Sequence, residues 1–387
     1  MSEIPLNGLP ADNPLGFLAA IGALVTVDRV MPGKGVALSW SATAAGWRPV
    51  LHLPGAVDEA GLTALLYVAL HREASSQSRD ELKGIKAQKP MAKELQRLKD
   101  AVKKAHQEKK AQAKALGLKK GSPELAELHA SLVAPAEQAE REARQLDEDV
   151  AERRRKLAAA GAMPDATTAL GSCVVVPARI YASFARSAAS EAKPCDRRTA
   201  DFAASFGCEL IVGSDGKLQP SQMSKHNGSG GKNMLSDMAA LMQETSKERL
   251  AAAVFRPWDY KDSKRGLGWD PADVRPYAYQ GMNPDDGEGA PTMHGANLLA
   301  YEALPLLPTA VRGTSIRTTG TVNKTFTWPV WKVPLGMDVV RSLLSLDVLH
   351  REDVDRRKLA ALGVSEVYRV EHYTFGKYPR FRPARPA

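Results

Sequence analysis

Between Tyr67 and Tyr181 the chain contains no Phe, Trp or Tyr. Aromatic side chains bury the largest areas in most cores, so a packed globular core rarely extends this far without one. The composition also changes abruptly near Arg79 and changes back near Gly161. We therefore expect these residues to form an element that projects from the rest of the protein.

The net charge is concentrated in the first half of this region. Residues 79–120 contain fourteen Lys and Arg against five Asp and Glu, a net charge of +9. The whole chain of 387 residues also carries +9, so the remaining residues sum to zero. A local excess of positive charge makes a polyanionic partner the first function to test.

The apolar pattern predicts two long antiparallel helices in this region. Apolar residues recur at helical spacing in two stripes: Leu95, Leu98, Val102 and Ala105, and then Leu125, Leu128, Leu132, Ala139, Ala143, Leu146, Val150 and Leu157. Between them, Ser122 followed by Pro123 is a helix start signal. Each helix would be on the order of 50 Å long. The second is net acidic, with nine Asp and Glu against six Lys and Arg, so we expect the helices to neutralise each other in part.

The flanking residues predict an α+β fold, a mixed α/β body with this long antiparallel α-helical hairpin as an insertion. Before the insertion we expect strands at 4–6, 36–40 and 47–53 and helices at 13–28 and 57–73. After it we expect buried strands at 173–176 and 208–213, a hairpin of 312–319 with 323–331, a late strand at 366–375, and helices at 235–254, 296–304, 337–349 and 353–362. The predicted parts are 1–78, the hairpin at 79–160, and 161–387, which ends in a basic, aromatic C-terminal tail.

Cysteine usage and the N-terminal sequence indicate the compartment. Cys173, Cys195 and Cys208 fit neither a disulfide framework nor paired zinc knuckles. The apolar stretch from Leu15 to Val27 is too short for a membrane span, and no secretion signal is visible. We expect a cytoplasmic protein with no membrane association.

No pattern of catalytic residues stands out. The eight histidines are scattered singly, without the spacing of metal ligands, and no nucleophile elbow sits between a strand and a helix. We therefore expect no enzymatic activity, cofactor or metal. A metal-dependent nuclease built from scattered aspartates such as Asp215, Asp237 and Asp259 is an alternative that no spacing supports.

The sharpest local feature is a glycine-rich segment that runs into an apolar helix near Met234. Backbone amides freed by glycines, with lysines beside them at a helix N-terminus, suit a phosphate group. It is not a Walker A loop, because Asn233 follows Lys232 where Ser or Thr is required. The candidate binding residues are Lys225, Asn227, Ser229, Gly230, Lys232 and Asn233. A mobile polar loop that caps a helix is the alternative.

Three further clusters mix basic with aromatic side chains, as surfaces that bind nucleic acids do. They are Arg312 and Arg317 with Lys324, Phe326 and Trp328 on the expected hairpin; the Tyr, Phe, Lys and Arg residues of 373–385; and the pair Arg197 and Arg198. Each cluster is also compatible with an ordinary structural strand or a solvated surface.

The N-terminal sequence IPLNGLPADNPLGFLAAIGAL (4–24), followed by LSW (38–40) and GWRPVL (46–51), carries a family resemblance. It resembles the N-terminus of the large-subunit proteins of type I CRISPR surveillance complexes (Cascade), in particular the compact I-U (or I-G) ones. The glycine-rich segment 224–233 is similar to theirs, and the match covers about a quarter of the chain. Large subunits of this family often end in a helical bundle, whereas the long helices here follow residue 78.

The resemblance implies a non-enzymatic, DNA-binding subunit of an antiviral, CRISPR RNA-guided complex. Such a subunit recognises the protospacer-adjacent motif (PAM) in duplex DNA, helps to open the duplex and recruits a helicase-nuclease, while the guide RNA reads the sequence. The implied partners are double-stranded target DNA, the CRISPR RNA-containing complex with its other subunits, and the helicase-nuclease. The glycine-rich segment would sense the motif, and chemistry assigns backbone contacts to Lys103, Lys104, Lys109, Lys110, Lys114, Arg312, Arg317 and Lys324. A protein-protein adaptor or scaffold subunit without direct DNA contact is the alternative.

Overall fold

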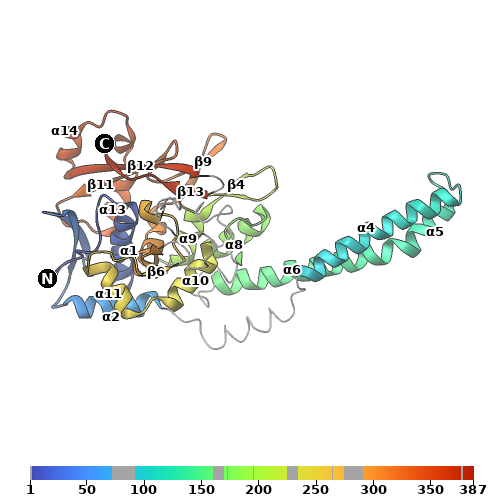
Figure 1. Cartoon of the computed structure of the whole chain (residues 1–387), viewed down its shortest axis with the longest axis horizontal. Coiled ribbons are helices and arrows are strands. Elements are labelled where there is room, and N and C mark those ends of the chain that lie inside the picture. Colours follow the sequence, from blue (N-terminus) through green and yellow to red (C-terminus); the bar gives the residue numbers. More distant parts are fainter. Residues whose placement is uncertain are drawn as a thin grey trace, which may run out of the picture.

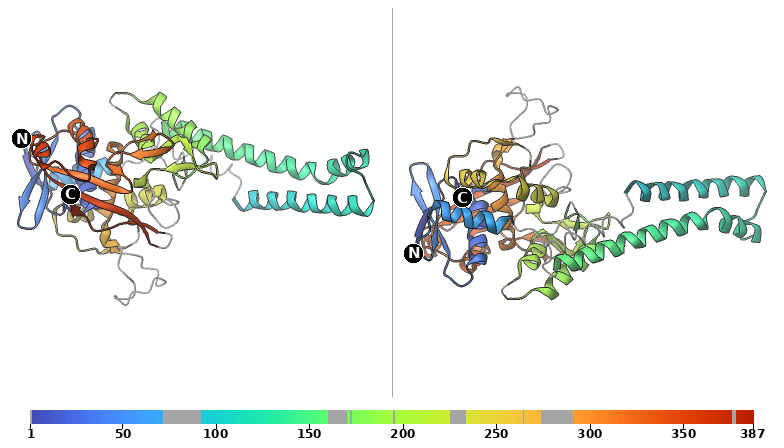
Figure 2. Two further views of the ribbon diagram at one scale, coloured as in Figure 1. Left: turned by 90° about the horizontal axis from the view of Figure 1, so that it is seen from above. Right: turned by 90° about the horizontal axis from the view of Figure 1, so that it is seen from below.

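The computed structural model describes residues 2–71, 92–159, 170–171, 173–194, 196–224, 234–263, 265–273, 291–375 and 378–387. These residues form an α+β body from which a helical arm extends to one side (Figure 1). Views from above and from below show the same separation of body and arm (Figure 2). The predicted fold class is therefore confirmed.

The elements of the body and of the arm follow in chain order. The body contains β1 (Ser2–Pro5), α1 (Pro14–Val30), β2 (Ala37–Thr43), β3 (Gly46–Leu53), α2 (Glu59–Leu70), α8 (Ala178–Glu191), α9 (Arg198–Phe206), β4 (Gly207–Val212), β5 (Leu218–Pro220), the 3₁₀ helix η1 (Gln222–Ser224), α10 (Met234–Glu244), α11 (Lys247–Phe255), β6 (Asp262–Ser263), η2 (Pro271–Asp273), β7 (Pro291–Thr292), α12 (His294–Glu302), η4 (Leu304–Leu306), β8 (Thr309–Arg312), β9 (Ser315–Thr318), β10 (Thr321–Val322), β11 (Thr325–Trp331), α13 (Met337–Leu344), η5 (Asp347–His350), α14 (Arg356–Ala361), β12 (Val364–Phe375), β13 (Tyr378–Phe381) and β14 (Arg385–Pro386). The arm contains α4 (Ala92–Ala115), α5 (Pro123–Leu132) and α6 (Ala134–Ala159).

Helix α1 lies at the centre of the body. It begins where the sequence predicts, because Asn13 Oδ1 accepts a hydrogen bond from the Leu15 N–H at 2.8 Å and Pro14 occupies the first turn. Its first fourteen residues are buried, and α12 packs along it. The two helices approach so closely that a Cβ on Gly22 would lie 1.8 Å from the carbonyl oxygen of Leu299. Gly22 is therefore required for packing.

Two antiparallel sheets meet this helix through large aromatic side chains. One sheet has the strand order β1-β3-β2, and the other has the order β10-β11-β12-β13 with β14 paired to β12. The Phe17 ring of α1 lies 5.9 Å from Trp40 of the first sheet and 5.6 Å from Trp328 of the second. Trp331 Nε1 also donates to the Leu38 carbonyl at 2.7 Å. Residues before and after the arm thus build one common core.

The arm is an antiparallel helical hairpin, as predicted (Figure 1). Helix α5 begins at the expected start signal, with Ser122 Oγ accepting from the Leu125 N–H at 3.3 Å. The second predicted helix is divided into α5 and α6 at Val133, because Pro135 lacks an N–H and its ring crowds the preceding turn. The predicted limits at 79 and 160 lie outside the described residues.

Helix α6 joins the arm to the body. It packs against α8 and α9, and Val150 is buried at this junction. Arg179 of α8 donates a hydrogen bond to the carboxylate of Glu148. Because α8 in turn packs against β4, the base of the arm is seated on the part of the body that carries the β4–β5 strands.

Three local predictions are wrong. Residues 173–176 form no strand, and the run leads directly into α8. Strand β4 occupies the predicted position but is not buried, since Leu210 is 74% exposed. The helix predicted at 235–254 is two helices, because Ser246 ends the first by capping α11, where its Oγ accepts from the Arg249 N–H at 3.3 Å.

Candidate nucleic-acid interface

The glycine-rich segment itself lies outside the described residues. This applies to all six candidates for motif recognition, Lys225, Asn227, Ser229, Gly230, Lys232 and Asn233. The elements on either side of it are described: η1 ends at Ser224, and α10 begins at Met234. Both flanking side chains are buried, so the structure fixes the two points between which the segment runs.

The first of these points lies at the base of the hairpin formed by β8 and β9. The N–H of Gln222 in η1 donates to Thr318 Oγ1 of β9 at 3.3 Å. The Oγ1 atoms of Thr309 and Thr318 lie 3.1 Å apart across that hairpin. The neighbouring N–H of Ser221 donates to the carbonyl of Phe206, just ahead of β4, at 2.7 Å. The chain therefore leaves for the glycine-rich segment beside the β8–β9 hairpin.

This hairpin carries two of the predicted backbone contacts. Arg312 is exposed next to the turn at Gly313, which adopts φ +60°, and Arg317 is half-buried on the returning strand. His350 of η5 lies near Arg317. Burial lowers the pKa of His350 to about 4, and the positive charges of Arg317 and Arg369 act in the same direction. His350 is thus neutral near pH 7 and does not add to the local positive charge.

Lys324 occupies a different turn from these arginines. Strands β10 and β11 pair with Val322 opposite Thr325, so Asn323 and Lys324 form a two-residue turn. Both residues have positive φ, 48° and 66°, which a tight turn of this kind requires. The lysine is exposed at the tip, and its backbone carbonyl accepts from the His372 N–H at 2.8 Å.

The predicted pairing of 312–319 with 323–331 is wrong, and so is the basic-aromatic surface inferred from it. Strand β11 instead pairs with β12 in the second sheet. Phe326 and Trp328 are fully buried, with their rings 5.2 Å apart, and Trp328 Nε1 donates to the Ala11 carbonyl at 2.8 Å. Neither ring can stack on a nucleic-acid base.

The C-terminal residues likewise form structure where the sequence predicts a tail. Strands β13 and β14 both pair with β12. Phe381 is buried, and the Arg382 guanidinium lies 4.8 Å from the centre of the Tyr373 ring. Arg382 Nε also lies 3.0 Å from Glu371 Oε2. Arg382 thus contacts Glu371 and Tyr373, while Phe381 packs in the core. Lys377 of this predicted cluster lies outside the described residues.

The predicted pair Arg197 and Arg198 serves the fold in the same way. Arg198 Nη2 lies 2.6 Å from Glu302 Oε1, and Arg29 Nη1 lies 2.6 Å from Glu302 Oε2. Burial alone would raise the pKa of Glu302, but the two guanidinium groups outweigh it and hold the pKa at about 2. Arg197 lies 3.5 Å from Asp201. Arg198 therefore joins α9 to α12 inside the body.

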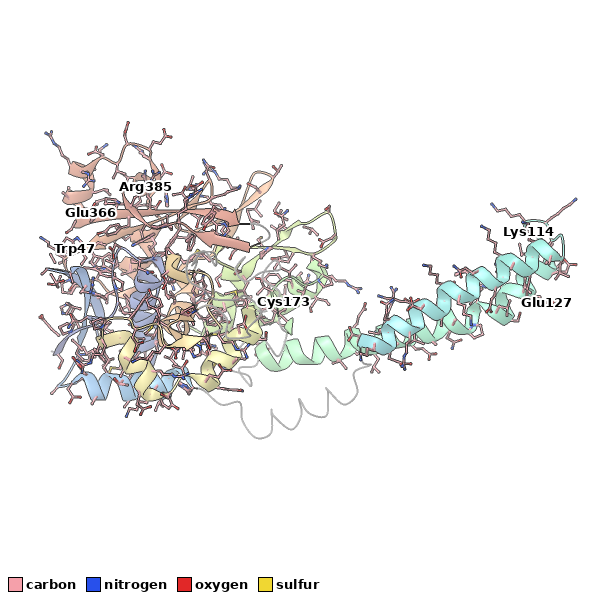
Figure 3. The ribbon with its side chains drawn as sticks, in the orientation of Figure 1. Trp47, Lys114, Glu127, Cys173, Glu366 and Arg385 are labelled. Carbon is pink, nitrogen blue, oxygen red and sulfur yellow. The ribbon has the colours of Figure 1, made fainter. Side chains whose placement is uncertain are left out.

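The lysines of α4 point in different directions around the helix. Successive residues of a helix are about 100° apart, so Lys99, Lys103, Lys110 and Lys114 fall within about 60° of one another around α4. We call these four the lysine stripe. Lys99 is a member that the sequence interpretation missed, although the spacing of four, seven and four residues could have shown it. In Figure 3, Lys114 and Glu127 lie on opposite sides of the arm.

The other two predicted lysines of α4 do not belong to the stripe. Lys104 Nζ lies 3.8 Å from Glu108 on its own helix. Lys109 is half-buried and lines a shallow groove against α5, together with Ser122 and His129. Within the described residues, none of the four stripe lysines makes an ion pair. The stripe therefore groups four exposed positive charges, without ion-pair partners among the described residues, on one side of α4.

A shallow groove of about 550 Å³ runs beside the stripe, with Val102 and His106 between the lysines and Glu140 on the facing helix. The acidic side chains at this seam are paired. Arg144 donates to the Glu140 carboxylate, and His106 Nε2 lies 3.2 Å from Glu137 Oε1. The contact between the two helices at this seam is thus made by His106, and among the described residues no lysine of α4 pairs with an acidic residue of α6.

The structure also places the residues considered for catalysis. Each of the three aspartates lies close to a cation: Asp215 to Lys217 at 3.3 Å, Asp237 to Arg265 at 3.0 Å and Asp259 to Lys261 at 2.9 Å. Among the described residues, no three His, Cys, Asp or Glu side chains gather where they could hold a metal ion.

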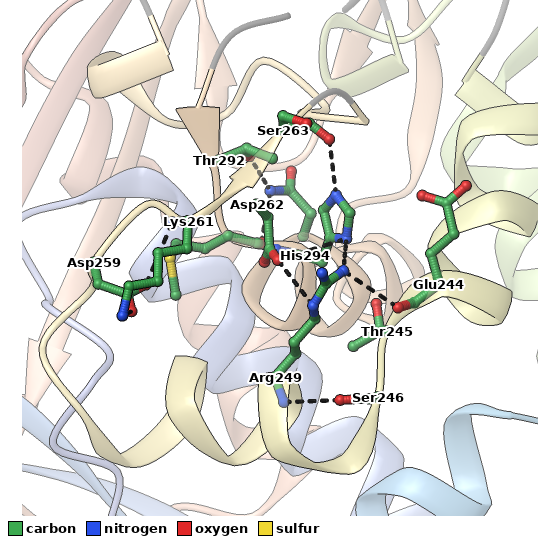
Figure 4. Close-up of polar contacts among 12 residues, drawn as sticks. Glu244, Thr245, Ser246, Arg249, Asp259, Lys261, Asp262, Ser263, Thr292 and His294 are labelled. Carbon is green, nitrogen blue, oxygen red and sulfur yellow. Dashed lines mark hydrogen bonds and ion pairs between the residues drawn. The ribbon is translucent and has the colours of Figure 1, made fainter. Parts of the chain in front are cut away.

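A buried polar cluster joins β6, α11 and α12 (Figure 4). Asp262 accepts from the His294 N–H at 2.7 Å and lies 3.2 Å from Arg249 Nε. The His294 ring has its Nδ1 3.4 Å from Arg249 Nη1 and its Nε2 3.3 Å from the Ser263 carbonyl oxygen. Since a guanidinium only donates and a carbonyl only accepts, the ring carries its proton on Nε2. Both nitrogens are occupied, and the cluster fixes the start of α12.

Over the described residues, no helix combines the length and the apolar character that crossing a bilayer requires.

No family model, curated protein or solved structure matches the chain. The likeness of residues 4–24 to large-subunit proteins therefore remains a prediction from the sequence.

Proposed function

We propose that this chain is a non-enzymatic, DNA-binding large subunit of a CRISPR RNA-guided type I complex. In this role it recognises the PAM in duplex DNA, aids strand opening and recruits a helicase-nuclease. Guide RNA pairing reads the target sequence, and this subunit reads only the short motif and the backbone. The protein acts in the cytoplasm with the other subunits of that complex.

The observation that carries the proposal is the lysine stripe. Lysines that face solvent without an acidic partner are available to phosphates, and neutralising phosphates releases counterions from DNA. The stripe sits on α4, which among the described residues contributes no side chain to the core of the body, so its charge is not explained by folding of the body. The net charge of +9 lies within residues 79–120, which include the stripe, whereas the remaining residues sum to zero.

The position of the β8–β9 hairpin supports the same function. Arg312 and Arg317 lie on the hairpin beside which the chain enters the glycine-rich segment. A segment of this composition can approach a groove closely, and the two arginines can contact the flanking phosphates. Motif reading and backbone contact would then occur at one place on the body.

The test is binding of the full chain to a library of duplexes that vary at the motif. Lys232→Ala with Asn233→Ala should weaken binding of the preferred duplex by about tenfold more than binding of a scrambled duplex. The matched control is Lys261→Ala, since Lys261 is exposed on the body and bound to Asp259. Equal losses on both duplexes would reduce the segment to a non-specific anchor, and no preferred motif would overturn the recognition role.

Two other outcomes would replace the proposal. Assembly with a ribonucleoprotein that is insensitive to salt, without any binding of free DNA, would identify an adaptor. DNA cleavage by the purified chain with magnesium, lost on replacing Asp215, Asp237 or Asp259 with Asn, would identify a nuclease.

A further inference from the structure

The lysine stripe is divided into two pairs by its spacing. Lys99 and Lys103 are one turn apart, as are Lys110 and Lys114, so the members of each pair are separated by about 6 Å along the axis of α4. The centres of the two pairs are about 16 Å apart. We propose that the arm binds duplex DNA by lying across its major groove, with one lysine pair on each of the two strands. This inference rests on the proposed function and specifies the ligand of the arm.

The dimensions favour the major groove over the minor one. The major groove of B-form DNA is about 12 Å wide and the minor groove about 6 Å, and the phosphate groups on either side add to both distances. A separation of about 16 Å between pairs therefore matches the phosphate rows that border the major groove. Each lysine side chain can adjust by several ångströms, because its four-carbon stem is flexible.

The arrangement of α4 keeps this spacing fixed. The helix is 24 residues long and packs along α6, which is seated on the body through α8. Two of the three acidic residues of α4, Glu94 and Glu108, fall at least about 120° from every stripe lysine around the helix. Asp100 lies at the edge of the stripe, about 40° from Lys114 around the helix, and accepts a hydrogen bond from Gln96 Nε2 at 3.1 Å. A straight helix with two fixed lysine pairs suits two phosphate rows at a constant separation. A single strand offers only one row.

The experiment measures the affinity of the full chain for a duplex and for a single strand of equal length, across a range of salt concentrations. Two double variants each remove one pair: Lys99→Ala with Lys103→Ala, and Lys110→Ala with Lys114→Ala. Each should weaken duplex binding by at least tenfold. The slope of the logarithm of the binding constant against the logarithm of the salt concentration should become less steep by about 1.8. Alanine favours helix, so circular dichroism should show α4 intact.

Two matched controls separate geometry from charge. Lys104→Ala with Lys109→Ala removes the same two charges from α4 but outside the stripe, and duplex affinity should change less than threefold. Lys103→Ala with Gln107→Lys keeps the charge of the stripe but breaks up the first pair, and it should weaken duplex binding while leaving single-strand binding unchanged.

Three results would overturn the inference. They are equal affinity losses on duplex and single strand, equal losses in the control Lys104→Ala with Lys109→Ala, or no loss when the first pair is broken up. Failure of the proposed function has a different signature, namely no preference for any motif by the unaltered chain. A chain that selects a motif but ignores the stripe variants would retain the proposed function and exclude the arm.

Discussion

The body and the arm use charged side chains in opposite ways. In the body, Glu302 is buried between Arg29 and Arg198, and Asp262 is buried against Arg249. In the arm, the lysine stripe faces solvent without acidic partners among the described residues. These buried carboxylates of the body are held by neighbouring cations at short distances, whereas the stripe lysines of the arm are exposed and make no ion pair with the described residues.

This difference separates charge that serves folding from charge that is available to a ligand. A buried ion pair loses its hydration, so removing one member leaves the other unpaired at a high energetic cost. An exposed lysine is hydrated and contributes little to stability. The net charge of the whole chain hides this contrast, because residues 79–120 carry a net charge of +9 while all other residues together sum to zero.

The largest effect is expected at the centre of the body. Glu302→Gln keeps the size of the side chain but leaves Arg29 and Arg198 without a counter-charge in a buried position. The free energy of unfolding should fall by about 3–5 kcal/mol, measured by chemical denaturation. The matched control is Glu142→Gln on the exposed face of α6, which should change stability by less than about 0.5 kcal/mol. Equal effects at both sites would remove the distinction between body and arm.

The pH dependence of stability should show the same buried charge. The pKa of Glu302 is about 2 in the folded protein and near the ordinary glutamate value of 4.5 when unfolded. The unfolded chain therefore binds this proton first as the pH falls, and roughly 3 kcal/mol of stability should be lost between pH 4.5 and 2. His350, whose folded pKa is lowered to about 4, adds an earlier loss as the pH falls from 6.5 to 4.

Denaturation curves measured from pH 7 to pH 2 test this order. His350→Gln should remove the earlier step and Glu302→Gln the later one. A single step that neither substitution alters would show that other groups dominate acid unfolding.

A smaller effect is expected where α1 meets α12. Gly22→Ala would place a Cβ 1.8 Å from the Leu299 carbonyl oxygen, which is backbone and must move with its helix. The expected cost is about 1–3 kcal/mol in thermal or chemical denaturation. Gly61→Ala is the control, because its nearest neighbour is the side-chain Oδ1 of Asp58 at 3.1 Å and alanine favours helix. A neutral Gly22→Ala variant would contradict the close packing of these helices.

The sequence predicted those parts of the fold that local chemistry determines. Asn13 with Pro14 and Ser122 with Pro123 start helices where expected, because a cap needs only its own next few residues. The strand predicted at 173–176 failed because a run of β-branched residues fits a half-buried coil as well as a strand. Exposure of Leu210 was likewise decided by tertiary neighbours.

The candidate site was less predictable, because pairing across the chain decides which residues reach solvent. Phe326 and Trp328 alternate with polar residues in a way that suits either a binding surface or a core strand. Only the pairing of β11 with β12 settles their burial. The stripe needed no tertiary information, since helix periodicity alone places Lys99 beside Lys103. The partner of Lys104 is equally local, because Glu108 lies four residues further along the same helix.

The smallest effects on folding should come from the residues proposed to matter most for binding. Lys103→Ala and Lys110→Ala each remove an exposed side chain without an acidic partner, so unfolding free energies should change by less than about 0.5 kcal/mol. Removing either positive charge slightly reduces repulsion within the stripe, and alanine favours helix, so the sign should be neutral or stabilising. Arg198→Ala in the body removes the same charge and should cost several kcal/mol, since it leaves Glu302 with one partner fewer. A lysine variant that destabilises the protein as much as Arg198→Ala would mean that the stripe serves folding, and the argument from unneutralised charge to a polyanionic ligand would then fail.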